Sequence, residues 1–119
     1  VPVFKNTSKN FFSLPNELFF LNIGHGVITV YAYLLYCEDR RTHQCHPSYR
    51  TISDVVHLTV STVMKHITKL ADRQFITGES TSYIDKRGMK WNGNNLYTIL
   101  PIQMAMDYCY QQQLLRLEA

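Results

Sequence analysis

The stretch of sequence that decides the fold is residues 47–76, which read PSYRTISDVVHLTVSTVMKHITKLADRQFI. Ser48 is a typical N-cap residue, and the helix that it opens is expected to run to about Val56. A second helix is expected to begin after the N-cap candidate Thr59 and to end near Arg73. Two short helices joined by a turn of about three residues must cross at a steep angle. The stretch therefore predicts a helix-turn-helix.

The second of these helices has two chemically different faces when its residues are placed 100° apart. One face is apolar and is expected to pack on the core; it holds Val63, Ile67, Leu70 and Ala71. The opposite face is short, polar and mostly basic; it holds Ser61, Lys65, Thr68, Lys69 and Asp72, with Thr62 at its edge. This profile is typical of a helix that enters the major groove of DNA. The alternative is an amphipathic helix whose polar face is merely solvated.

A β-hairpin is expected after the helix-turn-helix. The segments RQFITGES (73–80) and LYTILPI (96–102) have strand-like composition, and residues 81–95 between them contain glycine, asparagine and basic side chains. A hairpin with a long basic tip in this position is a wing, which lies along the minor groove or the phosphate backbone of DNA. Trp91 is expected to pack in the core at the base of the wing, with the sugar-phosphate surface as the alternative.

Additional helices are expected on both sides of this unit. Residues 11–21 predict a short helix with Ser13 as its N-cap, and residues 26–39 predict a central helix that is followed by a loop over residues 39–47. Residues 102–119 predict a last helix of about four turns. Its apolar stripe either covers the core or pairs with a second copy; it holds Ile102, Met106, Cys109 or Tyr110, Leu114 and Leu117.

The domain organisation that follows has three parts: a flexible arm over residues 1–10, a winged helix-turn-helix domain over residues 11–101 and a C-terminal helix over residues 102–119, a candidate dimerisation element. The expected fold class is mainly α with a small β-hairpin wing, with extra N-terminal and C-terminal helices.

Composition excludes some classes of protein and leaves others open. A net charge of +3 permits a polyanionic partner without requiring one. No apolar run reaches the roughly 18 residues that span a bilayer, so we expect no membrane association. Three cysteines without a CxxC pair fit a reducing cytoplasm, and their spacing relative to the histidines matches no standard zinc site. Catalytic motifs are also missing, so we expect no enzyme, no cofactor and no metal.

The segment VVHLTVSTVMKHITKLADRQFI (55–76) resembles the recognition region of GntR-type winged-helix regulators. The positions that carry the resemblance are Thr59, Thr62, Val63, Ile67, Leu70 and Ile76. Residues 11–53 and NNLYTILPIQ (94–103) resemble helix-turn-helix proteins of Gram-positive mobile elements, which are similar to the N-terminal domain of RepA-type replication initiators. His57 departs from the usual glycine of the turn, and Val60 departs from the usual polar residue, where it either contacts a thymine methyl group or fills space.

These features together predict sequence-specific binding of double-stranded DNA, by a replication initiator or a transcriptional regulator of a plasmid or mobile element. A homodimer fits the C-terminal helix, and the alternative function is a winged helix used for protein docking or dimerisation. Four roles are expected for the candidate residues. Phosphate anchors at the first helix are Ser48, Tyr49 and Arg50, and base-reading residues after the cap Thr59 are Ser61, Thr62 and Lys65. Residues that steady the recognition helix are His66 and Lys69, and wing contacts are Lys86, Arg87 and Lys90.

Overall fold

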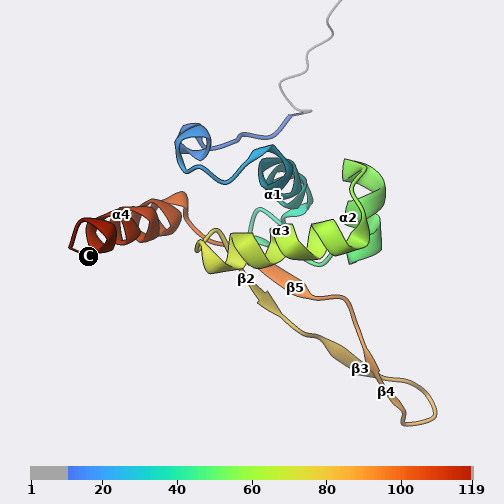
Figure 1. Ribbon diagram of the computed structural model, residues 1–119. Coiled ribbons are helices and arrows are strands. Elements are labelled where there is room, and N and C mark those ends of the chain that lie inside the picture. The colour runs from blue at the N-terminus through green and yellow to red at the C-terminus, as the bar shows by residue number, and fades with distance from the viewer. Residues whose placement is uncertain (1–10, 119) are drawn as a thin grey trace, which may run out of the picture.

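The computed structural model describes residues 11–118, and in them a bundle of helices carries a projecting hairpin (Figure 1). In chain order the elements are η1 (Asn16–Phe20), α1 (His25–Cys37), β1 (Gln44–Cys45), α2 (Tyr49–Val56), α3 (Val60–Asp72), β2 (Ile76–Glu79), β3 (Ser82–Ile84), β4 (Lys90–Asn92), β5 (Leu96–Ile99) and α4 (Ile102–Glu118). This is a winged helix-turn-helix with an additional helix at each end, as the sequence predicts. The predicted flexible arm, residues 1–10, lies outside the described residues.

The core forms where α3 packs on α1 and α2. From α3, the side chains of Val63, Ile67 and Leu70 are buried, as the apolar face predicts, while Ala71 is half-buried at its edge. Their partners are large side chains that are almost fully buried, among them Val30, Tyr31 and Leu34 of α1, Ile52 of α2 and Phe75 after α3. Burying each such aliphatic side chain contributes about 1.5–3 kcal/mol. The apolar stripe of α3 therefore fixes which of its faces remains exposed.

The turn between α2 and α3 has the geometry of a helix-turn-helix. His57 occupies the left-handed region, with φ 59° and ψ 39°, which is the conformation for which glycine is the usual residue. Two residues later, the Thr59 hydroxyl accepts a hydrogen bond from the Thr62 N–H at 3.3 Å and caps α3. The predicted boundaries of α2 and α3 are confirmed to within one residue.

A three-stranded sheet with the order β1-β5-β2 supports the wing. The sequence predicted two of its strands, β2 and β5, but β1 was wrongly assigned to a loop. A strand of two residues is too short to show an alternation of apolar and polar side chains. Its pairing also depends on a strand more than fifty residues away: Gln44 lies opposite Thr98, and Cys45 lies opposite Tyr97. Tyr97 is buried in the middle of this sheet, and its burial raises the pKa of its hydroxyl group.

The segments that flank the helix-turn-helix follow the prediction with one correction. At the N-terminal side, a 3-10 helix begins at Asn16 after Pro15, so Ser13 does not serve as an N-cap. α1 begins at His25, after Gly24 with φ 90°, and ends two residues earlier than predicted.

Helix α4 divides into a covered half and an exposed half. Ala105 is buried, and Ile102, Met106 and Cys109 pack against the core. From Tyr110 to Glu118 every residue is exposed. The first half of α4 therefore covers the core, and pairing with a second copy stays a prediction for the exposed second half. Within residues 11–118, no helix combines the length and apolar character that crossing a membrane requires.

Replacing Thr59 by alanine is expected to lower the free energy of unfolding by about 1 kcal/mol, because the Thr62 N–H loses its capping partner. The measurement is urea unfolding followed by far-ultraviolet circular dichroism. The matched control is Thr68→Ala in the same helix, where the exposed hydroxyl only donates to the Met64 carbonyl at 2.9 Å. That variant should unfold no more easily than the original chain. Equal losses in both variants would contradict the capping role.

Candidate nucleic-acid interface

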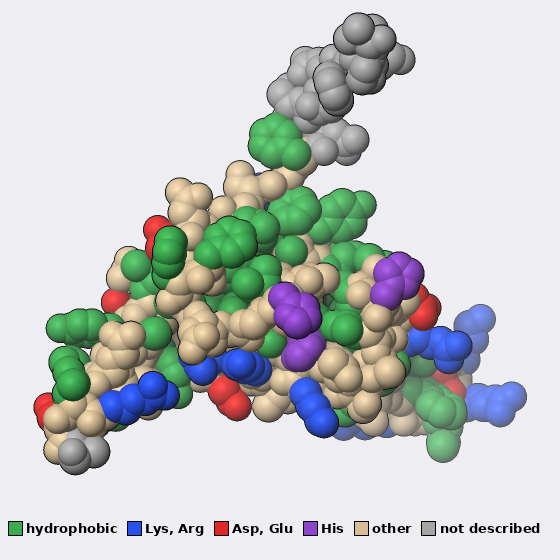
Figure 2. All heavy atoms as spheres, turned by 45° about the horizontal axis from the view of Figure 1, so that its top comes forward, with side chains coloured by type: hydrophobic (Ala, Val, Ile, Leu, Met, Phe, Trp, Pro, Cys, Tyr) green, Lys and Arg blue, Asp and Glu red, His purple; other side chains and the backbone are tan. Residues whose placement is uncertain are grey.

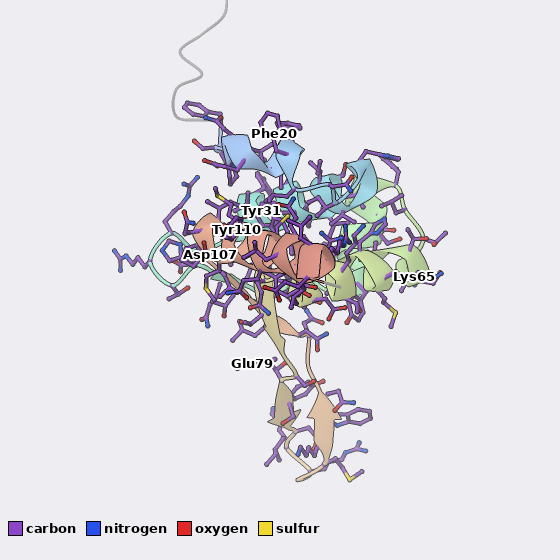
Figure 3. The ribbon with its side chains drawn as sticks, turned by 60° about the vertical axis from the view of Figure 1, so that its left-hand side comes forward. Phe20, Tyr31, Lys65, Glu79, Asp107 and Tyr110 are labelled. Carbon is purple, nitrogen blue, oxygen red and sulfur yellow. The ribbon has the colours of Figure 1, made fainter. Side chains whose placement is uncertain are left out.

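The exposed face of α3 lies between two flanks that are held by the rest of the domain. One flank, with His66 and Lys69, contacts the start of α1. The other begins at Val60, which lines a groove toward the base of the wing. Between the flanks, Ser61, Lys65, Thr68 and Asp72 are exposed to solvent. Figure 3 shows Lys65 at the outer edge of the helical body, while Glu79 lies where the chain leaves for the wing.

The α1 flank is a close contact. The Lys69 ammonium group donates to the Ile23 carbonyl at 3.1 Å, and a Cβ atom placed on Gly26 would lie 2.6 Å from Nε2 of His66. Partial burial lowers the pKa of the His66 imidazole, and the neighbouring Lys69 and His25 side chains lower it further, which favours the neutral ring. His66 therefore lies against α1 and Lys69 against the residues just before it, and direct DNA contact by either one stays a prediction.

The start of α3 is a cluster of small hydroxyl side chains. The Thr59 hydroxyl lies 2.8 Å from the Thr62 hydroxyl and 3.3 Å from the Ser61 hydroxyl, so the three hold one another in place. Ser61 is exposed and Thr62 is half-buried. These short side chains would allow the backbone of α3 to approach a ligand closely, and Lys65 extends from the next turn.

The start of α2 meets the base of the wing in a groove of about 330 Å³. Ser48 caps α2, since its hydroxyl accepts from the Thr51 N–H at 3.0 Å. The Tyr49 hydroxyl accepts from the Asn95 side chain at 2.8 Å, which ties α2 to the residues before β5. Arg50 is exposed. Of the three predicted phosphate anchors, two thus hold the local structure as well, and Arg50 is the one whose charge faces solvent.

Asparagine side chains at the base of the wing are structural links that the sequence reasoning missed. Besides the contact made by Asn95, the side chain of Asn94 donates to the His46 carbonyl at 3.1 Å, and the Asn94 carbonyl accepts from the Thr81 hydroxyl. The signal was the run NGNN, which we interpreted as turn composition alone.

The sequence reasoning also missed Met64 on α3. Its side chain is 45% exposed and lies one helical turn after Val60.

The wing itself is a hairpin in which Ser82, Tyr83 and Ile84 pair with Asn92, Trp91 and Lys90. Its tip is organised by Asp85, whose carboxylate accepts hydrogen bonds from the Arg87 N–H at 2.9 Å and the Met89 N–H at 3.0 Å. The basic side chains Lys86, Arg87 and Lys90 are all exposed. The structure therefore brings the three predicted wing contacts together on one projecting element (Figure 1).

Trp91 corrects the sequence prediction. It does not pack in the core but is 52% exposed, and its Nε1 donates to the second oxygen of Asp85 at 2.8 Å. This hydrogen bond and those from the two backbone N–H groups lower the pKa of the Asp85 carboxyl group, so Asp85 is ionised at neutral pH. The core-packing prediction failed because β3 and β4 extend beyond the helical body, which leaves no core against the ring.

Cys45 lies in the interior of the domain. Cys45 is buried, its thiol lies 3.7 Å from the Leu34 carbonyl, and burial raises its pKa to about 12, which disfavours the thiolate that binds metals. Within residues 11–118, no group of three or more His, Cys, Asp or Glu side chains has an arrangement that could hold a metal ion.

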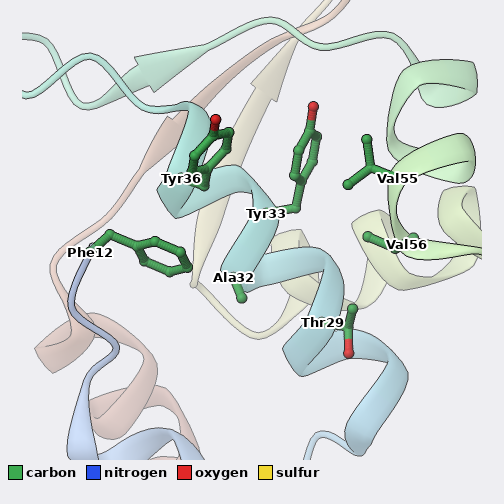
Figure 4. A pocket seen from close by; sticks show the side chains of 7 residues that line it. All are labelled: Phe12, Thr29, Ala32, Tyr33, Tyr36, Val55 and Val56. Carbon is green, nitrogen blue, oxygen red and sulfur yellow. The ribbon is translucent and has the colours of Figure 1, made fainter. Parts of the chain in front are cut away.

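An apolar groove lies away from the wing, between α1 and α2. Its volume is about 580 Å³, and Figure 4 shows Phe12 and Tyr36 on one side and Val55 and Val56 on the other, with Tyr33 between them. Tyr36 and Val55 are at least half exposed, at 68% and 50%. In Figure 2, hydrophobic side chains gather on the face that this view brings forward, while Lys and Arg side chains lie toward its lower edge and on the wing.

Comparisons with known proteins define the class of this domain. Residues 21–76 match the model of a family described as a helix-turn-helix domain, and this range covers α1, β1, α2, α3 and the first residue of β2. A possible transcriptional regulator from Methanosarcina mazei Go1 has a similar structure, with a TM-score of 0.52 and 21% sequence identity over 82% of this chain and 76% of that chain. No curated protein matches the chain. The fold is thus that of a winged helix-turn-helix protein, a class in which DNA binding is the common function.

Replacing Gly26 by alanine is expected to lower the free energy of unfolding by about 1 kcal/mol, because the new methyl group would force the half-buried His66 ring to shift. At an open helical position the same change would stabilise the chain by up to about 1 kcal/mol, so the sign of the effect is informative. Urea unfolding of Gly26→Ala, His66→Ala and the double variant measures the coupling. A smaller loss for Gly26→Ala in the His66→Ala background is expected, and strictly additive losses would contradict the contact.

Proposed function

We propose that this chain binds double-stranded DNA in a sequence-specific manner, with α3 as the recognition helix and without catalysis. The observation that carries the proposal is the exposed face of α3, whose short hydroxyl side chains and Lys65 lie between two flanks held by α1 and the wing base. An α-helix with its side chains is about 10–12 Å across, which fits a major groove about 12 Å wide. Ser61, Thr62 and Lys65 would then reach the base edges.

The wing and α2 would hold the flanking backbone. Lys86, Arg87 and Lys90 on the wing, with Arg50 at the start of α2, are exposed cations outside α3. Such contacts orient a protein on the duplex without reading its sequence. Asp72 lies at the far end of the exposed face, so base reading is assigned to the first turns of α3.

The biological setting that this proposal favours is regulation of transcription or replication initiation on a plasmid or mobile element, in the cytoplasm. The resemblance of residues 11–53 and 94–103 to proteins of such elements supports it. The structurally similar Methanosarcina mazei protein is described as a possible transcriptional regulator, which supports the regulatory role. Both settings use the same duplex-binding surface.

Lys65→Ala is expected to reduce affinity for the cognate duplex and also the preference for it over random DNA, by about 1–3 kcal/mol, because a base-reading contact is lost. Lys86→Ala is expected to weaken binding to all sequences alike and to reduce the slope of log K against log salt by about one unit, because a phosphate contact is lost. Fluorescence anisotropy over a salt series measures both effects, after selection of a preferred duplex from a random pool.

The control for these variants is Glu79→Ala, which removes a charge from β2, close to the wing but away from its basic tip. The Glu79→Ala variant should leave the magnitude of the slope of log K against log salt unchanged or raise it slightly. If Lys65→Ala and Lys86→Ala have the same effect on random and selected DNA, the reading role of Lys65 is wrong. If the original chain binds no duplex at low salt, the proposed function itself is wrong.

Protein contact is the second candidate function, and two uncovered apolar surfaces favour it. One is the groove between α1 and α2, and the other is the distal half of α4, where Tyr110, Leu114 and Leu117 are 62%, 40% and 82% exposed. These three residues share one face of the helix at 100° per residue. We propose that this face pairs with a second copy, which would give the two-fold symmetry with which helix-turn-helix dimers read paired half-sites.

Leu114→Glu is expected to convert the dimer to a monomer, because it places a charge in the centre of the proposed interface. Gln112→Glu adds the same charge to the opposite side of α4 and should leave the dimer intact. Sedimentation equilibrium measures the mass of each variant, and far-ultraviolet circular dichroism checks that both remain folded. A monomeric original chain at every concentration tested would refute the dimer.

A further inference from the structure

One face of the wing carries two exposed aromatic rings. Tyr83 and Trp91 are directly opposite in the register of β3 and β4, and opposite residues of an antiparallel pair share a face. They are 57% and 52% exposed. The aromatic ring pairs within residues 11–118 are formed by other residues, namely Phe12, Tyr31, Tyr33, Tyr36 and Phe75. The aromatic face of the wing, Tyr83 and Trp91, is thus open to an outside partner.

The ring of Trp91 is held in a defined position. Its Nε1 donates to Asp85 at 2.8 Å, and the other Asp85 oxygen is fixed by the N–H groups of Arg87 and Met89. Because the ring is already ordered, a partner that stacks on it loses little conformational entropy on binding. A side chain needed only for packing would gain nothing from being held in an exposed position.

Charge identifies the chemistry of the partner. Lys86 and Arg87 follow Asp85 at the tip, next to the aromatic face, and are exposed, whereas Lys90 is opposite Ile84 and lies on the other face of the hairpin. The carboxylate of Asp85 is engaged by three hydrogen bonds. Exposed aromatic rings with cations nearby form a combination that binds single-stranded nucleic acid, since bases stack on the rings while phosphates pair with the cations. The surface is therefore complementary to a nucleic-acid strand with accessible bases.

An intact duplex does not offer such bases to the wing. Its base faces are stacked on one another, and its minor groove is about 6 Å wide, whereas two paired strands are already about 4.8 Å apart before their side chains are added. We propose that the aromatic face of the wing stacks on unpaired bases of a DNA strand next to the duplex segment held by α3. The inference rests on the proposed function and narrows its substrate to duplex DNA with an adjacent unpaired region.

The test uses Trp91 itself, because it is the only tryptophan of the chain and its emission reports on base stacking directly. Three DNA probes are added at low salt: an intact duplex, the same duplex with an adjacent unpaired bubble, and oligothymidine. Emission should be quenched by the bubble and by oligothymidine but not by the intact duplex. Affinity, measured by anisotropy, should be higher for the bubble than for the intact duplex.

Variants separate stacking from a structural role. Trp91→Ala should reduce the preference for the bubble about 5- to 100-fold and leave binding to the intact duplex nearly unchanged. Trp91→Phe keeps an aromatic plane and should restore most of that preference. Ile84→Ala removes an apolar side chain that is 73% exposed on the opposite face of the wing, and it should change nothing.

The outcomes distinguish this inference from the proposed function. Duplex binding without quenching or bubble preference would overturn the inference and leave the proposed function intact. Equal losses of bubble and duplex binding in Trp91→Ala would also overturn it, because Trp91 would then only hold the wing. Quenching by oligothymidine without any duplex binding would support the aromatic face and refute duplex recognition by α3.

Discussion

The contact between α3 and α1 is the constraint on which the rest of the structure depends. Burial of Val63, Ile67 and Leu70 sets the rotation of α3 about its own axis, and the absence of a side chain on Gly26 allows the helices to approach closely beside His66. Once the apolar stripe is buried, helical geometry turns Ser61, Lys65 and Thr68 outward. The candidate recognition surface is thus a consequence of core packing rather than a separate feature.

A second, weaker set of contacts orients the wing relative to α3. The strand β5 is central in its sheet, where Tyr97 is buried, and the residues just before it are tied to α2 through Asn95 and Tyr49. This hydrogen bond lies in a part-buried position, where such a bond contributes about 1 kcal/mol. The base of the wing is therefore fixed against the start of α2, while its tip extends away from the helical body (Figure 1).

The parts of this structure that could be predicted are those with local causes. Ser48 and Thr59 cap helices through neighbours three residues away, and the turn at His57 follows from the short distance between two amphipathic patterns. The parts that could not be predicted depend on distant pairing. Strand β1 exists only because β5 lies beside it, and the exposure of Trp91 depends on how far the hairpin reaches beyond the core. Residue types identified the candidate site, but they could not distinguish Arg50, which faces solvent, from Tyr49, which holds the wing base.

The two candidate DNA surfaces differ in the forces that they would use, and this difference makes them separable. Contacts of Lys86 and Arg87 with phosphates would release counterions and weaken steeply as salt increases. Stacking of a base on Trp91 involves no charge on either ring, so its contribution depends little on salt. At low salt the cations would dominate binding to any DNA, and at higher salt the aromatic face would account for a growing share of the affinity for unpaired strands. Asp85 links both contributions, because one carboxylate orders the cation-bearing tip and the tryptophan ring together.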